Sequence, residues 1–334
     1  MSSGGRFFRS VFFAWPRRRA IIVAAVAVVV LPIEVSQAGW LQSMFKGSSK
    51  EDKSARHDKP AKQIASQKSA KAAKRADSQR PHSSKLAALG PIILPALKPA
   101  ATTCEPAKFR IVVDVGHTRE SDGAISARNV PEFDFNLKLA RRIEDKLKSD
   151  GFAATKLLVT DGKARPSLFK RVAAAQNLQA DLFLSIHHDS VPDKLLEDWE
   201  FEGKKSHFSD RFSGYSVWVS HDNANFKTSL AFAELLAKEM KAQGLEYAHQ
   251  YTQPIMGRYQ FPLLNKETGV YSHDELIVLG RTRIPAVLLE AGSIINRDEE
   301  LKMGSPKRQN ITASAVSAAV KEYCDARWAI LGPL

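Results

Sequence analysis

From Phe109 onward, short apolar runs alternate with longer segments in which apolar residues recur three or four positions apart. Short apolar runs are typical of buried strands, and the second pattern is typical of amphipathic helices. Strands that alternate with helices favour an α/β domain, because each helix returns the chain so that the next strand can run parallel to the last. Residues 104–334 are therefore expected to form a single α/β domain with a largely parallel, mixed β-sheet flanked by helices.

The elements of this domain are expected at defined places. Residues 191–212 and 245–275 fit neither period and are expected to be long loops or insertions. The expected strands are 109–115, 154–159, 181–186, 215–219 and 286–289, and the expected helices are 134–149, 167–179, 228–243 and 310–329.

Two segments of different composition precede the domain. Residues 1–38 combine a basic stretch at 17–19, an apolar run over 20–33 and a small-residue site ending at Ala38, which is the pattern of an export signal peptide. The apolar run of 14 residues would measure about 21 Å as a helix, short of a bilayer core of about 30 Å, so cleavage is favoured over an uncleaved anchor. Residues 39–103 are rich in Lys, Ala, Ser and Pro and predict a disordered basic linker. The protein is expected to be periplasmic or secreted.

The net charge of +13 lies entirely within those two segments. Residues 1–38 hold five Arg against one Glu, and residues 39–103 hold thirteen Lys or Arg against four acidic residues. The predicted domain therefore has no net charge, which argues against nucleic acid as a partner. Membrane contact is expected only through the signal segment or the basic linker, whose charge suits either adhesion to anionic envelope polymers or a solubilising spacer.

The two cysteines, Cys104 and Cys324, exclude a cysteine-based zinc module and a disulfide-rich scaffold. Cys104 precedes the first expected strand and Cys324 lies near the end of the last expected helix. In an oxidising compartment one bridge between them can tie the two ends of the domain together, the alternative being two unrelated thiols.

Three expected strands run directly into an ionisable residue, namely His117, His187 and Glu290. In open α/β sheets ligands bind outside the carboxyl ends of the strands, so side chains that several strands place there converge on one crevice. Two histidines and one carboxylate are the protein ligands of a catalytic zinc ion, which keeps a fourth position for water. The carboxylate is either Glu132, at the head of the helix that begins near Asp134, or Glu290.

Glu132 is the preferred ligand, because it can fold back toward the end of the first strand and leave Glu290 as a general base. Zinc lowers the pKa of bound water toward about 7, but a carboxylate is still needed to accept the proton and pass it to a leaving amine. One Zn²⁺ per domain and one free glutamate therefore suffice for amide hydrolysis.

Other polar residues near these positions are candidates for contacting a substrate. His188 is expected on the opposite side of the strand from His187, because side chains alternate, and it either supports the site or faces the substrate. Arg281 and Arg283 lie just upstream of Glu290 and are candidates for gripping substrate carboxylates, an interpretation that competes with a plain surface role.

Four short motifs follow one another in the chain. They are Asp114-Val115-Gly116-His117, Glu132-Phe133-Asp134-Phe135-Asn136-Leu137, Ser185-Ile186-His187-His188-Asp189, and Pro285-Ala286-Val287-Leu288-Leu289-Glu290-Ala291-Gly292 with Asn296. Together they resemble the zinc-dependent N-acetylmuramoyl-L-alanine amidases of the type that separates bacterial daughter cells. The resemblance covers about residues 109–325.

The resemblance implies that His117, Glu132 and His187 bind zinc and that Glu290 is the catalytic carboxylate, in agreement with the ligand set argued above. It also implies the substrate, which is the amide between N-acetylmuramic acid and the L-alanine of the stem peptide in peptidoglycan. A role in cell-wall remodelling or daughter-cell separation follows from the same resemblance. Asn136, in the second motif, becomes a further candidate for contacting substrate.

The chain also departs from the pattern of that family. Val115 stands where a Pro is usual and Thr118 where a Gly commonly follows the His, but both changes leave the ligands intact. Some members block their own site with an inserted helix that a partner protein removes, so 191–212 or 245–275 is a candidate for such an insertion and an activator protein is a candidate partner. The competing hypotheses are a zinc peptidase that acts on the stem peptide and a catalytically degenerate wall-binding protein.

Overall fold

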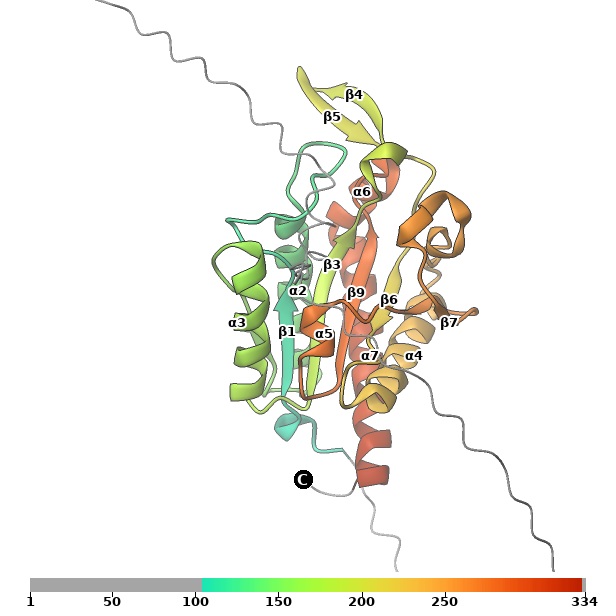
Figure 1. Cartoon of the computed structure of the whole chain (residues 1–334). Coiled ribbons are helices and arrows are strands. Elements are labelled where there is room, and N and C mark those ends of the chain that lie inside the picture. The colour runs from blue at the N-terminus through green and yellow to red at the C-terminus, as the bar shows by residue number, and fades with distance from the viewer. Residues whose placement is uncertain (1–103, 332–334) are drawn as a thin grey trace, which may run out of the picture. The chain divides into compact units, whose positions relative to one another are not determined.

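A mixed β-sheet forms the centre of the domain (Figure 1). The computed structural model describes residues 104–331, with side chains described as far as residue 326. The seven strands of the sheet lie in the order β2-β1-β3-β9-β6-β8-β7. β2, β1, β3 and β9 are parallel, β6 is antiparallel to β9 but parallel to β8, and β7 is antiparallel to β8. The strands are β1 (Ile111–Val115), β2 (Lys156–Leu158), β3 (Leu182–Asp189), β6 (Ser216–Val219), β7 (Leu263–Asn265), β8 (Val270–Ser272) and β9 (Ala286–Ser293).

Helices cover both faces of this sheet (Figure 1). Side chains alternate across a strand, so a strand buried on both faces needs an unbroken apolar run. In β1, Val113 faces a core shared with α2, α4 and α7, whereas Val112 faces a core shared with α3 and α5. The helices are α2 (Glu132–Ser149), α3 (Ala164–Asn177), α4 (Phe226–Ala242), α5 (Ile277–Gly280), α6 (Arg297–Gly304) and α7 (Pro306–Leu331), with short 3-10 turns η1 (Pro106–Lys108), η2 (Asp193–Leu195), η3 (Gln250–Thr252) and η4 (Pro254–Tyr259).

The predicted α/β architecture with a largely parallel, mixed sheet is confirmed. All five expected strands and four expected helices are present, and their ends differ from the expected ones by at most four residues. The interpretation of 245–275 as a loop or insertion was wrong, because this segment supplies β7 and β8 to the sheet. It is therefore an integral part of the fold and not a removable insertion.

Residues 191–212 form η2 and a separate two-stranded hairpin, β4 (Glu197–Phe201) and β5 (Lys204–Phe208). The turn consists of Glu202 and Gly203, both at positive φ, which is the backbone that a two-residue hairpin turn of type I′ requires. In the middle of β4, the Trp199 indole donates to the carbonyl of Ala127. The hairpin stands apart from the main sheet (Figure 1).

A disulfide joins Cys104 to Cys324, with the Cα atoms 5.4 Å apart, and so ties the start of the domain to α7. The expected signal segment at 1–38 and the expected linker at 39–103 lie outside the described residues. Among the residues that are described, no helix has both the length and the apolar character needed to cross a bilayer.

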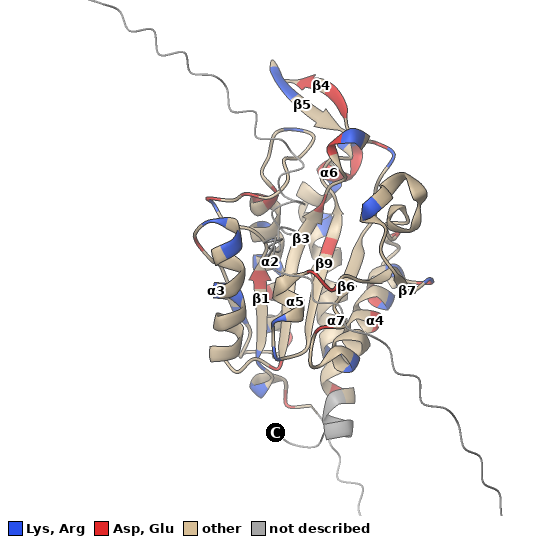
Figure 2. Ribbon diagram, viewed as in Figure 1, with Lys and Arg blue, Asp and Glu red and all other residues tan. Residues whose placement is uncertain are grey.

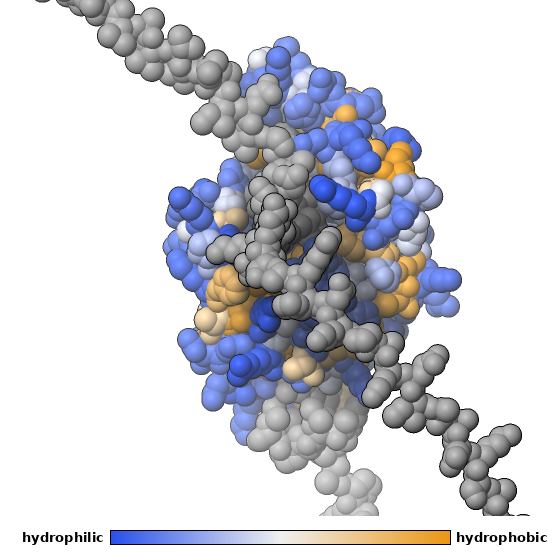
Figure 3. All heavy atoms as spheres, viewed as in Figure 1, coloured by the Kyte–Doolittle hydropathy of each residue, from blue (hydrophilic) through white to orange (hydrophobic). Residues whose placement is uncertain are grey.

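Charged residues lie mainly on helices, loops and the hairpin, and the central strands are largely uncharged (Figure 2). In the hairpin, β4 is acidic and β5 is basic (Figure 2). The visible surface is mostly hydrophilic with separate apolar areas, one of them over α3 (Figure 3), where Phe169 is 47% exposed. A group of buried ionisable residues lies at or near the carboxyl ends of β1, β3 and β9, namely Asp114, His187, Asp189 and Glu290.

Candidate metal centre

His117 lies two residues beyond the end of β1, where the backbone turns sharply. Its φ is 65°, in the left-handed region that residues with a Cβ rarely adopt. The residue before it, Gly116, has no room for a side chain, because a Cβ there would lie 2.5 Å from the His187 imidazole. The glycine therefore lets the ring of His187 lie directly against the β1 turn.

Glu132 is the first residue of α2 and is fully buried. The loop that leads to it holds it through two hydrogen bonds with Ala124: the Glu132 amide donates to the Ala124 carbonyl at 2.8 Å, and the Ala124 amide donates to Glu132 Oε2 at 3.0 Å. Within α2, the side-chain amide of Asn136 donates to Glu132 Oε1 at 3.0 Å and to the backbone carbonyl of Gly116 at 3.2 Å. The carboxylate is thus fixed in position by backbone and side-chain donors.

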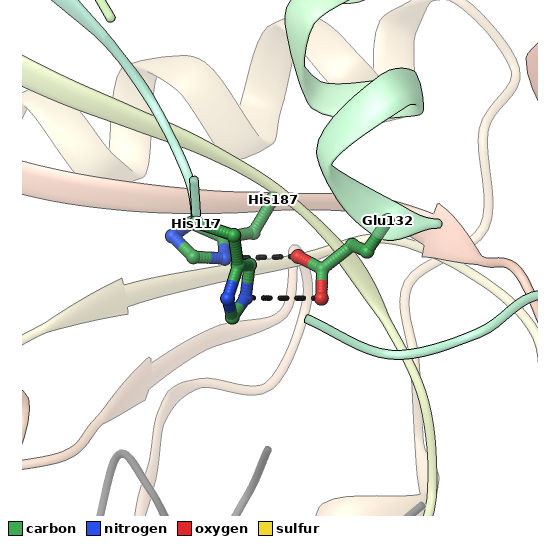
Figure 4. A group of neighbouring side chains, drawn as sticks. All are labelled: His117, Glu132 and His187. Atoms are coloured by element: carbon green, nitrogen blue, oxygen red, sulfur yellow. Dashed lines mark hydrogen bonds and ion pairs between the residues drawn. The ribbon is translucent and has the colours of Figure 1, made fainter. Parts of the chain in front are cut away.

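The two imidazoles and this carboxylate meet at one point (Figure 4). His117 Nε2 lies 3.0 Å from Glu132 Oε2, and His187 Nδ1 lies 3.0 Å from Glu132 Oε1. One ligand atom from each residue can be chosen so that all three lie within 4.8 Å of one another. Neighbouring ligand atoms on a tetrahedral zinc ion with bonds of about 2.0–2.1 Å are about 3.3 Å apart. The donor types and their spacing therefore fit a zinc ion with small side-chain adjustments.

The protonation of this cluster also suits a metal ion. Burial raises the pKa of the Glu132 carboxyl, but the charges and hydrogen bonds of His117 and His187 outweigh that effect and hold the pKa well below its usual range. Burial lowers the pKa of His187 to about 4, although Glu132 acts in the opposite direction. A metal ion binds an ionised carboxylate and a neutral imidazole. Glu132 and His187 are therefore in their metal-binding forms at neutral pH.

Glu290 lies beside the cluster on the neighbouring strand β9. It is the register partner of His187, so the two side chains project from the same face of the sheet. Glu290 is 6% exposed, and its Oε2 is buried with no hydrogen-bond partner among the described residues. Burial raises the pKa of Glu290 well above its usual range, and the charges of Asp189 and Glu132 raise it further. A carboxylate in this environment is well suited to accept a proton.

Asp189, at the end of β3, lies near Glu290, whose pKa its charge raises. The hydroxyl of Tyr251, in η3, donates to Asp189 Oδ2. Burial raises the pKa of Asp189 to about 7, against the hydrogen bonds that it accepts. Residues 245–275 therefore contribute a hydrogen-bond donor beside the site, Tyr251, as well as two strands of the sheet.

His188 and Asn136 lie behind the cluster and not at an open surface. His188 is 2% exposed and Asn136 is fully buried, and His188 Nδ1 lies 2.7 Å from Asn136 Oδ1. Because Asn136 also donates to Glu132, the two residues form a chain of hydrogen bonds that ends on the carboxylate. Both side chains therefore help to hold Glu132 in place. Because both are buried, their placement does not agree with the expected contact with substrate.

Arg281 and Arg283 do not lie near Glu290. Both precede β9, whose carboxyl-terminal half carries Glu290, and both are exposed. From the first residue of β9, Ala286, the strand runs four residues to Glu290, about 13 Å at about 3.3 Å per residue, and Arg283 lies before that start. The predicted grip on substrate carboxylates remains untested, and the alternative surface role agrees with the exposure of both arginines.

Two residues of the site were not expected from the sequence. Gly123, at φ 84°, lies against the cluster, and a Cβ there would come within 2.7 Å of the His117 ring. Arg171, on α3, is 1% exposed and donates to the backbone carbonyl of His117. The sequence does contain one sign that Arg171 is buried. It is a lone arginine on the apolar face of a predicted helix, with Val172 and Ala175 at helical spacing.

The hairpin β4–β5 in the segment 191–212 packs beside the loop before α2 and the start of α6. Its polar and ring contacts include Ala127, Arg128 and Arg297, which lie in the loop before α2 and in α6. The proposal that 191–212 blocks the site, and that an activator relieves the block, remains an untested prediction.

The chain is similar in sequence to known proteins. A sequence model of the family described as N-acetylmuramoyl-L-alanine amidase matches residues 111–322. The chain is 26% identical over 230 residues to the uncharacterized protein YqiI of Bacillus subtilis, covering 69% of this chain and 92% of the relative. It is 25% identical over 236 residues to the N-acetylmuramoyl-L-alanine amidase AmiC of Escherichia coli, covering 64% of this chain and 52% of AmiC. Among solved structures, the catalytic domain of the amidase CwlV from Bacillus (Paenibacillus) polymyxa is similar with a TM-score of 0.47 and 26% identity, covering 64% of this chain and 97% of that domain.

Proposed function

This chain belongs to the N-acetylmuramoyl-L-alanine amidase family, and we propose that it uses one zinc ion to hydrolyse the amide bond between N-acetylmuramic acid and L-alanine in peptidoglycan. The family resemblance of the four sequence motifs is thereby confirmed. The observation that carries the proposed chemistry is the meeting of His117, Glu132 and His187 around one point. Glu290 stands beside them on the adjacent strand.

Each of these side chains has a distinct task in the proposal. His117, Glu132 and His187 would hold the ion, and Asn136 and His188 keep the Glu132 carboxylate in place through hydrogen bonds. A bound zinc ion would supply a water of lowered pKa and stabilise negative charge on the oxygen of the scissile amide.

Glu290 would accept the proton of the attacking water and then deliver it to the leaving nitrogen of L-alanine. Its Oε2 has no competing hydrogen bond among the described residues, so it is free to take up that proton. Its raised pKa makes it a stronger base than an exposed glutamate and also helps it to return the proton as an acid.

The location and cellular role extend the same proposal. A peptidoglycan substrate requires a location outside the cytoplasm, in agreement with the export signal expected at 1–38. We therefore propose a periplasmic or secreted enzyme of cell-wall remodelling or daughter-cell separation. The basic linker at 39–103 would contribute contact with anionic envelope polymers.

Product analysis of purified muropeptides tests the proposed reaction. The exported form, with and without added zinc, is incubated with disaccharide-peptide fragments, and the products are identified by mass spectrometry. We expect intact stem peptides with a free L-alanine amino group and sugars with a free lactyl carboxyl group. Peptides shortened within the stem would instead establish a stem-peptidase. Intact muropeptides with zinc bound would establish a wall-binding protein without activity.

A further inference from the structure

Arg171, in the middle of α3, is the largest of the fully buried side chains among the described residues. A guanidinium is always charged, and a buried charge is costly unless it is paired and hydrogen-bonded. Its burial on the face of the sheet that carries His187 and Glu290 therefore calls for specific partners. Those partners all belong to the strands that carry the metal centre.

The partners of Arg171 are a backbone carbonyl and a carboxylate. Its Nη2 donates to the carbonyl oxygen of His117, and its Nε lies 3.7 Å from Asp114 Oδ1. Asp114 is fully buried on β1, and its Oδ2 accepts a hydrogen bond from Ser185 Oγ at 2.7 Å. Asp114 and Ser185 are register partners on β1 and β3. Arg171 is thus connected to both strands that deliver a histidine to the cluster.

The carbonyl that Arg171 holds belongs to His117, whose backbone is in the left-handed region. His117 has a φ of 65°, a conformation in which its Cβ crowds the backbone. A residue of this kind keeps such a conformation only where its surroundings fix it. Since φ determines where the Cα–Cβ bond points, the donor on the His117 carbonyl also helps to aim the imidazole at Glu132.

The charge of Arg171 would by itself oppose a metal cation nearby. Asp114 offsets that charge, because its carboxylate faces the guanidinium and is held in place by Ser185. The pair therefore supplies a fixed donor beneath His117 while adding little net charge to the site.

We propose that Arg171 is a positioning residue of the metal centre, which keeps His117 in the left-handed conformation from which its imidazole can bind the ion. This inference rests on the proposed metal site. It assigns to Arg171 no contact with substrate or with the ion itself. Loss of Arg171 should therefore weaken metal binding more than it weakens the fold.

The test compares the zinc affinity and the thermal stability of matched variants of the exported form. Arg171→Met keeps the length and apolar stem of the side chain but removes the donors. Residues that orient a metal ligand typically change metal affinity by about 10–100-fold, so we expect a rise in the zinc Kd of that size in competition with a chromophoric chelator. Arg171→Lys, which retains one charged donor, should recover part of the affinity. The matched control is Val172→Ala, the next residue of α3, which removes buried volume and should lower Tm without changing the zinc Kd.

A second readout reports the geometry of the ion directly. The visible absorption of the Co²⁺-loaded protein depends on ligand arrangement, so Arg171→Met should change its bands and Val172→Ala should not. Ser185→Ala provides a milder variant should Arg171→Met fail to fold, because it removes only the hydrogen bond that holds Asp114. We expect it to raise the zinc Kd by about tenfold, the lower end of the same range.

The outcomes separate this inference from the proposed function. An unchanged zinc Kd and Co²⁺ spectrum in Arg171→Met, with only a lower Tm, would overturn the positioning role while leaving the metal site intact. If Arg171→Met does not fold, an unchanged zinc Kd in Ser185→Ala overturns it equally. Failure of the unaltered protein to bind zinc would instead remove the proposed function, and the inference with it.

Discussion

Replacement of Glu290 by Gln should abolish most of the activity without loss of the metal ion. The change keeps the size and shape of the side chain and removes its ability to accept a proton. Glu290 Oε2 has no hydrogen-bond partner among the described residues, so the new amide breaks no described bond there. His187, its register partner, keeps its neighbour of the same volume. The zinc ligands should therefore stay in place.

The size of the effect follows from the role of the carboxylate. General acid–base catalysis by one positioned side chain contributes about 10²–10⁴-fold, and each factor of ten corresponds to about 1.4 kcal/mol of activation free energy. Glu290 is expected to act twice, on the water and on the leaving amine. We therefore expect kcat to fall by about 10³–10⁴-fold, or about 4–5.5 kcal/mol in the barrier.

The same substitution should also affect stability in a pH-dependent way. The pKa of Glu290 in the metal-free folded protein lies well above its usual value because of burial and the charges of Asp189 and Glu132. The unfolded chain therefore loses this proton at a lower pH than the folded chain, and the free energy of unfolding decreases as pH rises above about 4.3. Glu290→Gln has no such proton, so metal-free Glu290→Gln should be more stable than the metal-free unaltered protein at pH 8 and not at pH 4.

The assay measures kcat on purified muropeptides together with zinc content by elemental analysis, and Tm in the presence of a chelator. Arg283→Ala is the control, since Arg283 is exposed at the opposite end of β9 and should leave kcat unchanged. A kcat for Glu290→Gln close to that of the unaltered protein, with zinc retained, would refute the assignment of Glu290 as the base. A loss of zinc in this variant would show instead that Glu290 is a ligand.

Three further predictions concern the surroundings of the site and the fold. Gly116→Ala should reduce bound zinc to background in elemental analysis, because the new Cβ would lie 2.5 Å from the buried His187 ring and must displace it; retained zinc would contradict the packing. Asp189→Asn should raise the Tm of the metal-free protein increasingly between about pH 4 and pH 7, since burial raises the pKa of Asp189 to about 7 and its ionisation then costs stability; a pH-independent difference would contradict this. Replacing both Cys104 and Cys324 by Ser should lower the free energy of unfolding in urea by about 2–5 kcal/mol, because the bridge closes a loop with a sequence separation of 220; an unchanged urea midpoint would count against the bridge.

The close approach of His117, His187 and Glu290 was predictable, because it depends on strand direction alone. β1, β3 and β9 are parallel, so residues that follow or end these strands must lie along one edge of the sheet. His187 and Glu290 are even direct register partners. Glu132 was harder to place, since its position depends on the loop before α2 and on hydrogen bonds with Ala124 that no pattern in the sequence displays.

Other features could not be predicted, also for physical reasons. Arg281 and Arg283 are close to Glu290 in sequence, but β9 carries the chain about 3.3 Å per residue, so the two arginines lie beyond its amino-terminal end and Glu290 lies toward its carboxyl end. β7 and β8 have three residues each, too few to show an alternating pattern, and their place in the sheet depends on pairing with distant β6. The burial of Arg171 could not be predicted, because a buried charge is stabilised by its partners. Those partners, His117 and Asp114, lie far from Arg171 in the sequence.

The position of the metal ion tests the proposed zinc site most directly. A crystal of the zinc-loaded domain, measured on both sides of the zinc absorption edge, shows each zinc ion as an anomalous difference peak. We expect one strong peak within about 2.0–2.2 Å of a nitrogen of His117, a nitrogen of His187 and an oxygen of Glu132, with Glu290 close by but not bound. A peak elsewhere, or none at these three residues in a protein that cleaves muropeptides, would contradict it.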